Sequence, residues 1–214
     1  MSQHSKVAVV GLGVMGLPIV TNLVRAGVQT EVWNRSEPAM VKALASGAYR
    51  MNSLSECSAR VVLTVLPDIQ EVREVLANGL SSALKPDSIL VVMGTVSPVA
   101  MVELANEYAA LGVRVVDAPM SGGDVGAIAG TLSIMVGGDQ GTFDELTPTF
   151  SAIGKTIRLL GPVGSGQIAK ACNQVVVAIT LTALGEAVTL ARRTGLDAHA
   201  VLDILSGGLA NSQA

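Results

Sequence analysis

The feature that most constrains this chain is a glycine-rich turn near its amino end. A short aliphatic run, Val7–Val10, leads into Gly-Leu-Gly-Val-Met-Gly at residues 11–16, and a helical pattern follows. In such a turn the first glycine permits a tight bend, the second lets the backbone approach a pyrophosphate, and the third lets helix and strand pack closely. At a first strand-to-helix junction this spacing favours a dinucleotide site over a turn that serves packing alone. The expected cofactor contacts are Gly11, Leu12, Gly13, Val14, Met15 and Gly16.

The rest of the chain alternates between short β-branched runs and longer helical stretches. Strand patterns cover residues 6–10, 29–34, 60–65, 88–93, 113–117, 132–136 and 156–160, and helical patterns cover 15–26, 38–46, 69–77, 98–111 and 141–152. Glycines follow four of these helices, at Gly27, Gly47, Gly79 and Gly112, where we expect left-handed backbone. The alternation predicts an α/β fold of the Rossmann type, a doubly wound and mostly parallel sheet whose parallel connections are right-handed.

The pattern changes after residue 161. No strand pattern follows, and residues 167–193 and 198–205 are helical in character. We therefore expect a dinucleotide-binding domain over residues 1–161, and over 162–214 a long interdomain helix with the beginning of a helical domain. Residues 168–190 carry more apolar surface than one Rossmann face can cover, so we expect a homodimer or a higher homo-oligomer.

Composition excludes several classes of protein. The chain has 214 residues and a formal net charge of −3, which argues against a nucleic-acid partner because such proteins need a basic stripe. Cys57 and Cys172 are too far apart for a disulfide framework or a zinc site, so we expect a reduced, cytoplasmic protein without a metal. The mean hydropathy of +0.53 is high, but the uncharged stretch in the long helical pattern, residues 171–185, is too short and too polar to span a membrane. The first residues show no signal-peptide pattern.

The end of the second predicted strand carries the residues that select the cofactor. An Asp or Glu about 20 residues beyond the glycine turn accepts a hydrogen bond from the 2′-hydroxyl of NAD. Here Asn34 takes that position, and Arg35 and Ser36 follow. A guanidinium and a hydroxyl suit a 2′-phosphate, so the sequence favours NADP(H) over NAD(H). In the alternative, Arg35 is solvated and Glu31 binds the ribose of NAD(H).

Two further strand ends point to the same crevice, because ligands of open α/β sheets bind outside the carboxyl ends of the strands. Leu66 and Pro67 end the strand pattern at 60–65, and Pro67 stiffens the turn. Thr95 follows the next strand and offers a hydroxyl to a ribose or a nicotinamide. Alternatively, Thr95 and Ser97 cap the helix that begins near Pro98.

Two later segments place polar groups in apolar surroundings. Ser121 and the two glycines after it follow a buried strand pattern and can present N–H groups and a hydroxyl to an anion such as a carboxylate, with a plain tight loop as the alternative. Lys170, Asn173 and Gln174 are spaced i, i+3 and i+4 and so share one face of the long helix. Taken alone, the lysine is better explained as a surface side chain that extends to solvent.

In this order the motifs resemble those of the β-hydroxyacid dehydrogenase family, which includes 3-hydroxyisobutyrate dehydrogenases and tartronate semialdehyde (2-hydroxy-3-oxopropionate) reductases and has a 6-phosphogluconate dehydrogenase-like NAD-binding domain. The resemblance runs from Val7 to the last residue, and its motifs lie at 11–16, 117–123 with 130–132, 164–174, 186–187 and 195–197. It implies that Lys170 is the catalytic acid/base. It also implies that the substrate is held by Ser121, Gly122, Gly123, Asn173 and Gln174, and that the cofactor is contacted by Leu66, Pro67 and Thr95.

The resemblance also implies a reaction, which is hydride transfer between a nicotinamide cofactor and a small β-hydroxyacid or semialdehyde. Asn173 and Gln174, like the Gly-Gly-Leu-Ala segment at 207–210, look more like the tartronate semialdehyde reductases. Two features depart from the family pattern. Met93 stands where an acidic residue is more usual, and family members continue into a longer helical domain with a second active-site lysine, so we expect a C-terminally truncated chain.

Two alternatives stay open. Imine reductases share this architecture, but they generally lack a lysine at the position of Lys170. The chain could also be a non-catalytic dinucleotide-binding sensor or interaction module that keeps the Rossmann half without the chemistry.

Overall fold

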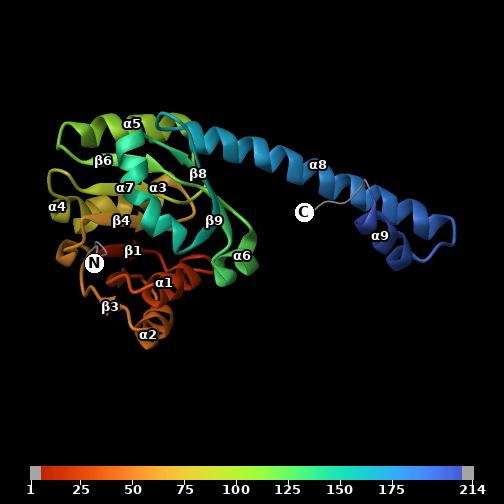
Figure 1. Ribbon diagram of the computed structural model, residues 1–214, viewed down its shortest axis with the longest axis horizontal. Coiled ribbons are helices and arrows are strands. Elements are labelled where there is room, and N and C mark those ends of the chain that lie inside the picture. Colours follow the sequence, from red (N-terminus) through yellow and green to blue (C-terminus); the bar gives the residue numbers. More distant parts are fainter. Residues whose placement is uncertain (1–5, 209–214) are drawn as a thin grey trace. The chain divides into compact units, whose positions relative to one another are not determined.

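The computed structural model describes residues 6–208 (Figure 1). Residues 1–5 and 209–214, which include Leu209 and Ala210 of the segment at 207–210, lie outside it. Its strands are β1 (Val7–Val10), β2 (Thr30–Trp33), β3 (Tyr49–Arg50), β4 (Val61–Thr64), β5 (Ile89–Val92), β6 (Arg114–Asp117), β7 (Met120–Ser121), β8 (Leu132–Gly137) and β9 (Gly154–Gly161). Its helices are α1 (Gly16–Arg25), α2 (Glu37–Ala45), α3 (Ile69–Val75), α4 (Ser81–Ala83), α5 (Pro98–Ala109), α6 (Gly123–Ala129), α7 (Gln140–Ser151), α8 (Ser165–Arg193) and α9 (Ala198–Gly207). A 3-10 turn spans Leu54–Glu56, and a π-helical segment, Leu76–Leu80, links α3 to α4.

The strands form one sheet, as expected for a doubly wound α/β fold. Its order is β3-β2-β1-β4-β5-β6-β8-β7, and β9 pairs with β8. The pairs from β3 through to β6 are parallel, whereas β8 runs antiparallel to β6 and β7 and parallel to β9. After β6 the chain continues in the same direction into β7. It then turns back through the short helix α6, so β8 runs antiparallel to both strands. The mostly parallel sheet predicted from the alternation is confirmed.

Every predicted strand and helix forms, with its ends shifted by at most a few residues. The alternative of a plain tight loop after Ser121 is wrong, because α6 follows, with Gly122 (φ +126°) as its N-cap and Gly130 (φ +68°) as its C-cap. Glycine is a poor helix former, so the glycines of this segment give no helical pattern in the sequence. The four glycines expected to adopt left-handed backbone all do so, namely Gly27, Gly47, Gly79 and Gly112.

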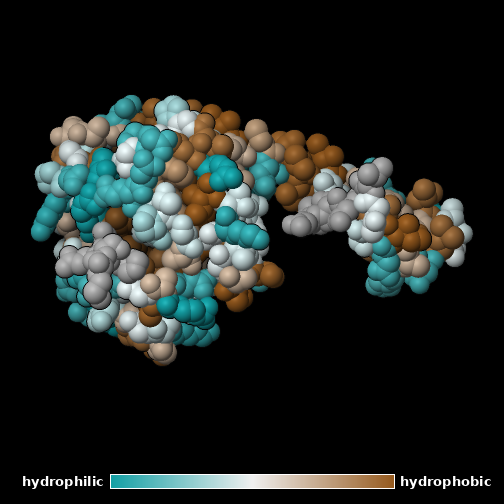
Figure 2. All heavy atoms as spheres, viewed as in Figure 1, coloured by the Kyte–Doolittle hydropathy of each residue, from teal (hydrophilic) through white to brown (hydrophobic). Residues whose placement is uncertain are grey.

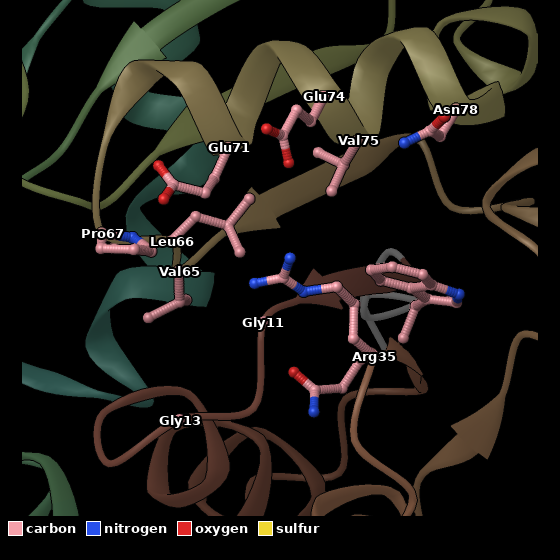
Figure 3. Close-up of a pocket in the computed structure, with 12 residues that line it drawn as sticks. Gly11, Gly13, Arg35, Val65, Leu66, Pro67, Glu71, Glu74, Val75 and Asn78 are labelled. Atoms are coloured by element: carbon pink, nitrogen blue, oxygen red, sulfur yellow. The ribbon is translucent and has the colours of Figure 1, made fainter.

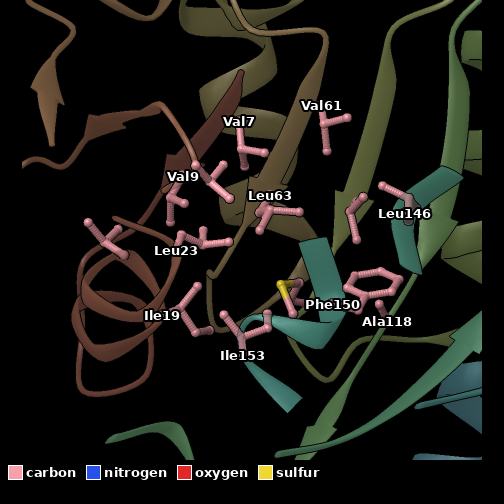
Figure 4. Close-up of a cluster of buried hydrophobic side chains, with 14 of the residues drawn as sticks. Val7, Val9, Ile19, Leu23, Val61, Leu63, Ala118, Leu146, Phe150 and Ile153 are labelled. Atoms are coloured by element: carbon pink, nitrogen blue, oxygen red, sulfur yellow. The ribbon is translucent and has the colours of Figure 1, made fainter. Parts of the chain in front are cut away.

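Two apolar clusters cover the two faces of the sheet. Successive strand residues point to opposite faces, so Val7 and Val9 belong to one cluster while Ala8 and Val10 belong to the other. Helices α1 and α7 pack on the first cluster (Figure 4), and α3 and α5 pack on the second. Burial on both faces explains why the central strands are continuous apolar runs.

The chain divides into two compact units, Met1–Lys170 and Ala171–Ala214. This division falls inside α8, beyond the boundary that we expect near residue 161, and that boundary stays a prediction. In the second unit, Gly195 (φ +78°) ends α8, and the Asp197 carboxylate caps α9 by accepting from His199 N at 2.9 Å. These contacts give the motif at 195–197 a structural role as the corner between two helices.

The helices of the second unit expose an apolar surface, and Figure 2 shows hydrophobic atoms gathered over α8. Its exposed large side chains include Val175, Val176, Ile179, Leu181, Leu190, Leu196 and Ile204. By length and composition alone α8 could cross a membrane, since its most apolar stretch of 18 residues has a mean hydropathy of 1.7 and is 6% buried. The same test is passed by core helices of proteins that never enter a bilayer, so one such helix is a weak sign. The apolar side chains need a cover of lipid or of protein.

Candidate active site

The glycine turn between β1 and α1 is held by backbone contacts that only glycine permits. Gly11 has φ +101°, and a Cβ built there would lie 2.4 Å from the carbonyl oxygen of Val65. A Cβ on Gly16 would lie 2.0 Å from the carbonyl oxygen of Gly11. The tight bend and the close packing predicted for the first and third glycines are therefore confirmed. A Cβ on Gly13 would meet no protein atom within 4 Å, so the turn is open to a ligand at that residue.

A pocket lies beside this turn, at the carboxyl ends of β1, β2 and β4 (Figure 3). Six of the predicted cofactor residues line it, namely Gly11, Gly13, Asn34, Arg35, Leu66 and Pro67. The other predicted contacts do not line it, namely Leu12, Val14, Met15, Gly16, Ser36 and Thr95. Its remaining walls, which the sequence did not single out, are Trp33, Val65, Glu71, Glu74, Val75 and Asn78. Four of these residues, at 71, 74, 75 and 78, are spaced as on one face of a helix. This spacing is the sequence feature from which they could have been predicted to share one wall.

Asn34 ties the end of β2 to the glycine turn. Its Oδ1 accepts a hydrogen bond from the backbone N–H of Leu12 at 3.0 Å, and its Nδ2 donates to the carbonyl oxygen of Ser36 at 3.3 Å. The amide thus fixes the chain on both sides of the position where a dinucleotide's ribose is usually read. In this arrangement Asn34 shapes the pocket wall.

Glu31 does not reach the pocket, so the alternative in which it binds the ribose is wrong. Its carboxylate is buried and accepts from Ser58 N at 2.9 Å, Ser58 Oγ at 2.7 Å, Ala59 N at 3.2 Å and Lys6 Nζ at 3.0 Å. Burial acts to raise the pKa of Glu31, but the hydrogen bonds from Ser58 and Lys6 outweigh it and hold the pKa below its ordinary value. Glu31 is therefore a structural anion that joins β2 to the start of β4.

Arg35 stands differently. Its side chain is exposed and extends into the pocket, facing the wall of α3 that carries Glu71 and Glu74 (Figure 3). Among residues 6–208 no carboxylate lies within ion-pairing distance of its guanidinium. A guanidinium that no protein anion engages is available to a ligand anion.

The loop that carries Thr95 rests on the loop after β4. A Cβ on Gly94 would lie 2.0 Å from the carbonyl oxygen of Leu66, so the two loops touch through backbone. Ser97 is the N-cap of α5, where its Oγ accepts from Ala100 N at 3.4 Å ahead of Pro98 in the first turn. The capping interpretation therefore holds for Ser97 and is wrong for Thr95, which lies two residues before the N-cap of α5.

Asp117, at the end of β6, connects the two motifs that follow it. Its buried carboxylate accepts from the backbone N–H of Gly164 at 2.7 Å and of Gln167 at 2.8 Å, at the start of α8. Burial raises its pKa, although these two hydrogen bonds act in the opposite direction. From Asp117 the chain runs within four residues to Ser121, which is half-buried at the end of β7.

The turn at 121–123 exposes its backbone. Gly122 (φ +126°) and Gly123 (φ +61°) are both exposed at the start of α6. The far end of α6 is joined to α1, because Asn22 Nδ2 donates to the carbonyl oxygen of Ala127 at 2.7 Å. Ordered backbone N–H groups in such a turn can bind a small carboxylate.

Lys170 lies in the second turn of α8 and is half-buried. Burial lowers the pKa of its ammonium. Further along the helix, Asn173 Nδ2 donates to Gln174 Oε1 at 3.2 Å, and Gln174 is exposed. Desolvation that moves a lysine toward deprotonation is a property of acid/base lysines.

Comparisons with known proteins match nearly the whole chain. The model for the NAD binding domain of 6-phosphogluconate dehydrogenase matches residues 6–161, and the model for the NAD-binding of NADP-dependent 3-hydroxyisobutyrate dehydrogenase matches residues 164–214. The chain is 38% identical over 212 residues to the 2-hydroxy-3-oxopropionate reductase of Escherichia coli, covering 97% of this chain and 72% of the relative. It is 34% identical to the solved structure of Mycobacterium tuberculosis 3-hydroxyisobutyrate dehydrogenase with L-serine, with a TM-score of 0.86 over 97% of this chain and 72% of that one.

Imine reductases are similar at the level of fold. The structure of a Streptomyces aurantiacus imine reductase gives a TM-score of 0.85 over 94% of this chain and 72% of that one, at 22% identity. At this identity the likeness shows a shared fold alone.

Proposed function

The chain belongs to the β-hydroxyacid dehydrogenase family, and on that premise we propose that it transfers a hydride between NADP(H) and a small β-hydroxyacid or its semialdehyde. It is an NAD(P)-dependent oxidoreductase acting on CH–OH groups. Among relatives, 2-hydroxy-3-oxopropionate reductase and 3-hydroxyisobutyrate dehydrogenase name the substrate class that we propose for it. The observation that supports the proposal most concerns α8. The start of this helix is hydrogen-bonded to Asp117 at the end of β6, and one turn later the helix carries Lys170, whose pKa is lowered by burial.

We propose that the glycine turn, Leu66, Pro67 and Thr95 hold the cofactor and that Arg35 selects NADP(H). Two observations support this preference. Arg35 extends into the pocket and forms no ion pair within residues 6–208, and the carboxylate of Glu31 in β2 is already hydrogen-bonded to Ser58, Ala59 and Lys6. A 2′-phosphate offers the bidentate acceptor that a guanidinium fits best.

Replacing Arg35 with alanine should lower kcat/KM with NADPH by about 10- to 100-fold, because a hydrogen bond to a charged group contributes about 1.5–3 kcal/mol. With NADH the change should stay within about threefold, since that cofactor has no 2′-phosphate for the guanidinium to bind. Steady-state kinetics with both cofactors measures the ratio. Arg158→Ala, at an exposed arginine of β9, is the matched control and should leave the ratio unchanged. A wild-type protein that strongly prefers NADH would contradict the assignment of Arg35.

The proposed chemistry needs one proton from the protein. When bound, the cofactor supplies or accepts the hydride. In reduction the Lys170 ammonium donates a proton to the carbonyl oxygen of the substrate, and in oxidation the neutral amine removes the hydroxyl proton. The backbone N–H groups of Gly122 and Gly123, with the Ser121 hydroxyl, hold the substrate carboxylate, and the amides of Asn173 and Gln174 orient its hydroxyl or carbonyl group.

A substrate panel tests the proposal directly. Small β-hydroxyacids and semialdehydes are each assayed with NADP(H) and NAD(H) by absorbance of the reduced nicotinamide, alongside a cyclic imine. Turnover of a hydroxyacid or semialdehyde is the expected result. Cofactor binding without turnover of any member would favour the sensor alternative, and turnover of the imine alone would favour the imine reductase alternative.

We also propose that a second copy of the chain covers α8 and α9. Lipid is a poor cover because Lys170, Asn173, Gln174 and Glu186 interrupt the apolar surface of α8, and polar groups are costly in a bilayer. An apolar groove on α8, lined by Ala178, Ile179, Thr182, Ala183 and Glu186, offers a seat for a partner helix.

Light scattering should therefore give a mass of at least twice the chain's 21.8 kDa. Ile179→Glu should reduce it to the monomer, because it places a charge in the proposed contact. Val41→Glu, at an exposed valine of α2, is the control and should leave the mass unchanged. A well-behaved wild-type monomer, or flotation of the protein with lipid vesicles, would contradict the proposal.

A further inference from the structure

We propose that Gln167 is a positioning residue that sets the separation between the Thr95 loop and the helix that carries Lys170. Gln167 lies in the first turn of α8 and is 2% exposed. Its side-chain Oε1 accepts from the backbone N–H of Val96 at 3.0 Å, and its Nε2 donates to the carbonyl oxygen of Gly94 at 2.9 Å. A side chain from α8 therefore grips the loop after β5 through two hydrogen bonds.

The two bonds bracket Thr95. The carbonyl of Gly94 belongs to the peptide group before Thr95, and the N–H of Val96 belongs to the peptide group after it. Val96 is buried and Gly94 is partly buried, so losing the amide leaves a buried donor and a partly buried acceptor without this partner. Among uncharged side chains, a primary amide is the one that offers a donor and an acceptor side by side on one flat group.

The helix side of this contact is also fixed. Asp117 accepts from the backbone N–H of Gln167 itself at 2.8 Å and from that of Gly164 at 2.7 Å. The carboxylate fits so closely that a Cβ on Gly137 would lie 2.3 Å from its Oδ1 and a Cβ on Gly166 would lie 2.8 Å from its Oδ2. The backbone of Gln167 is thus held by β6 while its side chain holds the loop after β5.

The loop side is braced by its neighbour, because Gly94 contacts the carbonyl oxygen of Leu66 through backbone. Lys170 follows Gln167 by three residues, which is one helical turn. The amide of Gln167 therefore fixes the distance between Lys170 and the loops that follow β4 and β5. This inference rests on the proposed function, in which Thr95 faces the nicotinamide side of the cofactor and Lys170 moves the proton.

Gln167→Leu, which keeps the side-chain size, should lower kcat/KM by roughly 10- to 100-fold, because misplacing reacting groups by about 1 Å costs up to about 10²-fold. The loss should fall mainly on kcat, since Gln167 does not line the cofactor pocket at Arg35. Asp139→Ala is the control. It removes the N-cap hydrogen bond of α7, in which Asp139 accepts from Thr142 N at 2.9 Å. Thr142 contacts Arg114, which lies at the opposite end of β6 from Asp117. This variant should lose stability and keep its kcat.

The pH dependence of Gln167→Glu distinguishes a positioning role from a merely structural one. A protonated carboxyl group can donate to Gly94 and accept from Val96, as the amide does, whereas the carboxylate faces the Gly94 carbonyl oxygen without a donor. Activity of this variant relative to wild type should therefore rise as the pH falls. Burial and the neighbouring carboxylate of Asp117 place that rise above the ordinary range of a glutamate pKa. Gln167→Leu should show no such rescue.

Hydrogen exchange of the Val96 amide, followed by NMR without cofactor, tests the contact independently of turnover. The exchange rate should rise at least tenfold in Gln167→Leu and should fall back toward wild type in Gln167→Glu at low pH. Unchanged Val96 exchange, or a Gln167→Leu kcat within about twofold of wild type, would overturn the inference. If Lys170→Ala stays active while Val96 exchange responds as expected, the assignment of Lys170 fails and the Gln167 contact stands.

Discussion

Lys170→Ala should abolish measurable turnover while leaving NADP(H) affinity within about threefold of wild type. The physical reason is that the reaction needs a proton at the substrate oxygen as the hydride arrives, and a positioned acid/base group typically contributes about 10²–10⁴-fold in rate. Lys170 is half-buried, and it does not line the pocket at the glycine turn. Its removal therefore changes proton transfer without opening the cofactor pocket. Steady-state kcat and quenching of protein fluorescence by NADPH measure the two quantities separately.

Lys155→Ala is the matched control, because it removes an exposed lysine of β9 and should keep the wild-type kcat. The pH profile supplies a second check. Because burial lowers the pKa of Lys170, reduction, which needs the ammonium, should slow as the pH rises through that lowered pKa. Oxidation, which needs the neutral amine, should speed up over the same range. A near-normal kcat in Lys170→Ala would remove the lysine from the mechanism.

The fold was predictable because its strands are buried on both faces. Val7–Val10 and Ile89–Val92 are continuous apolar runs, and such runs stand out in a sequence even without alternation. The elements that were missed carry no such signal. Strands β3 and β7 have two residues each, and α6 is rich in glycine, so local preference says nothing about them and tertiary contacts decide.

The candidate site was predictable at positions where the backbone geometry permits only one residue type. The roles of Gly11 and Gly16 follow from their spacing, since a Cβ on either residue would lie 2.4 or 2.0 Å from backbone that any Rossmann turn brings close. Side-chain partners were harder. Glu31 could not be excluded as a ribose ligand until Ser58 and Ala59 were seen to occupy its carboxylate, and these residues lie 27 and 28 positions away.

Gln167 shows the same limit most clearly. Its partners at Gly94 and Val96 are 73 and 71 positions away in the sequence. Nothing local to the long helix indicates that this amide faces the interior and reaches another loop. A sequence motif can mark such a residue as part of a segment, but its role is defined only by the contact across the fold.

Gly16→Ala should lower NADP(H) affinity by at least about 100-fold and destabilise the protein by roughly 1–3 kcal/mol, the usual cost of overpacking. A Cβ at this residue would lie 2.0 Å from the carbonyl oxygen of Gly11, which is backbone and cannot rotate away. Helix α1 must therefore move off β1, and the N–H groups at its start lose the position from which they bind a pyrophosphate. Thermal unfolding and NADPH titration measure the two effects.

Gly13→Ala separates packing from ligand contact within the same turn. A Cβ there would meet no protein atom within 4 Å, so the free energy of unfolding should change by less than about 0.5 kcal/mol. Affinity for NADP(H) should still fall, because the added methyl group occupies the space through which the backbone approaches the pyrophosphate. The two variants therefore give different pairs of results: loss of stability and binding for Gly16, and loss of binding alone for Gly13. If Gly16→Ala kept both its stability and its affinity for NADP(H), the requirement for glycine at this position would not come from the close packing of α1 against β1.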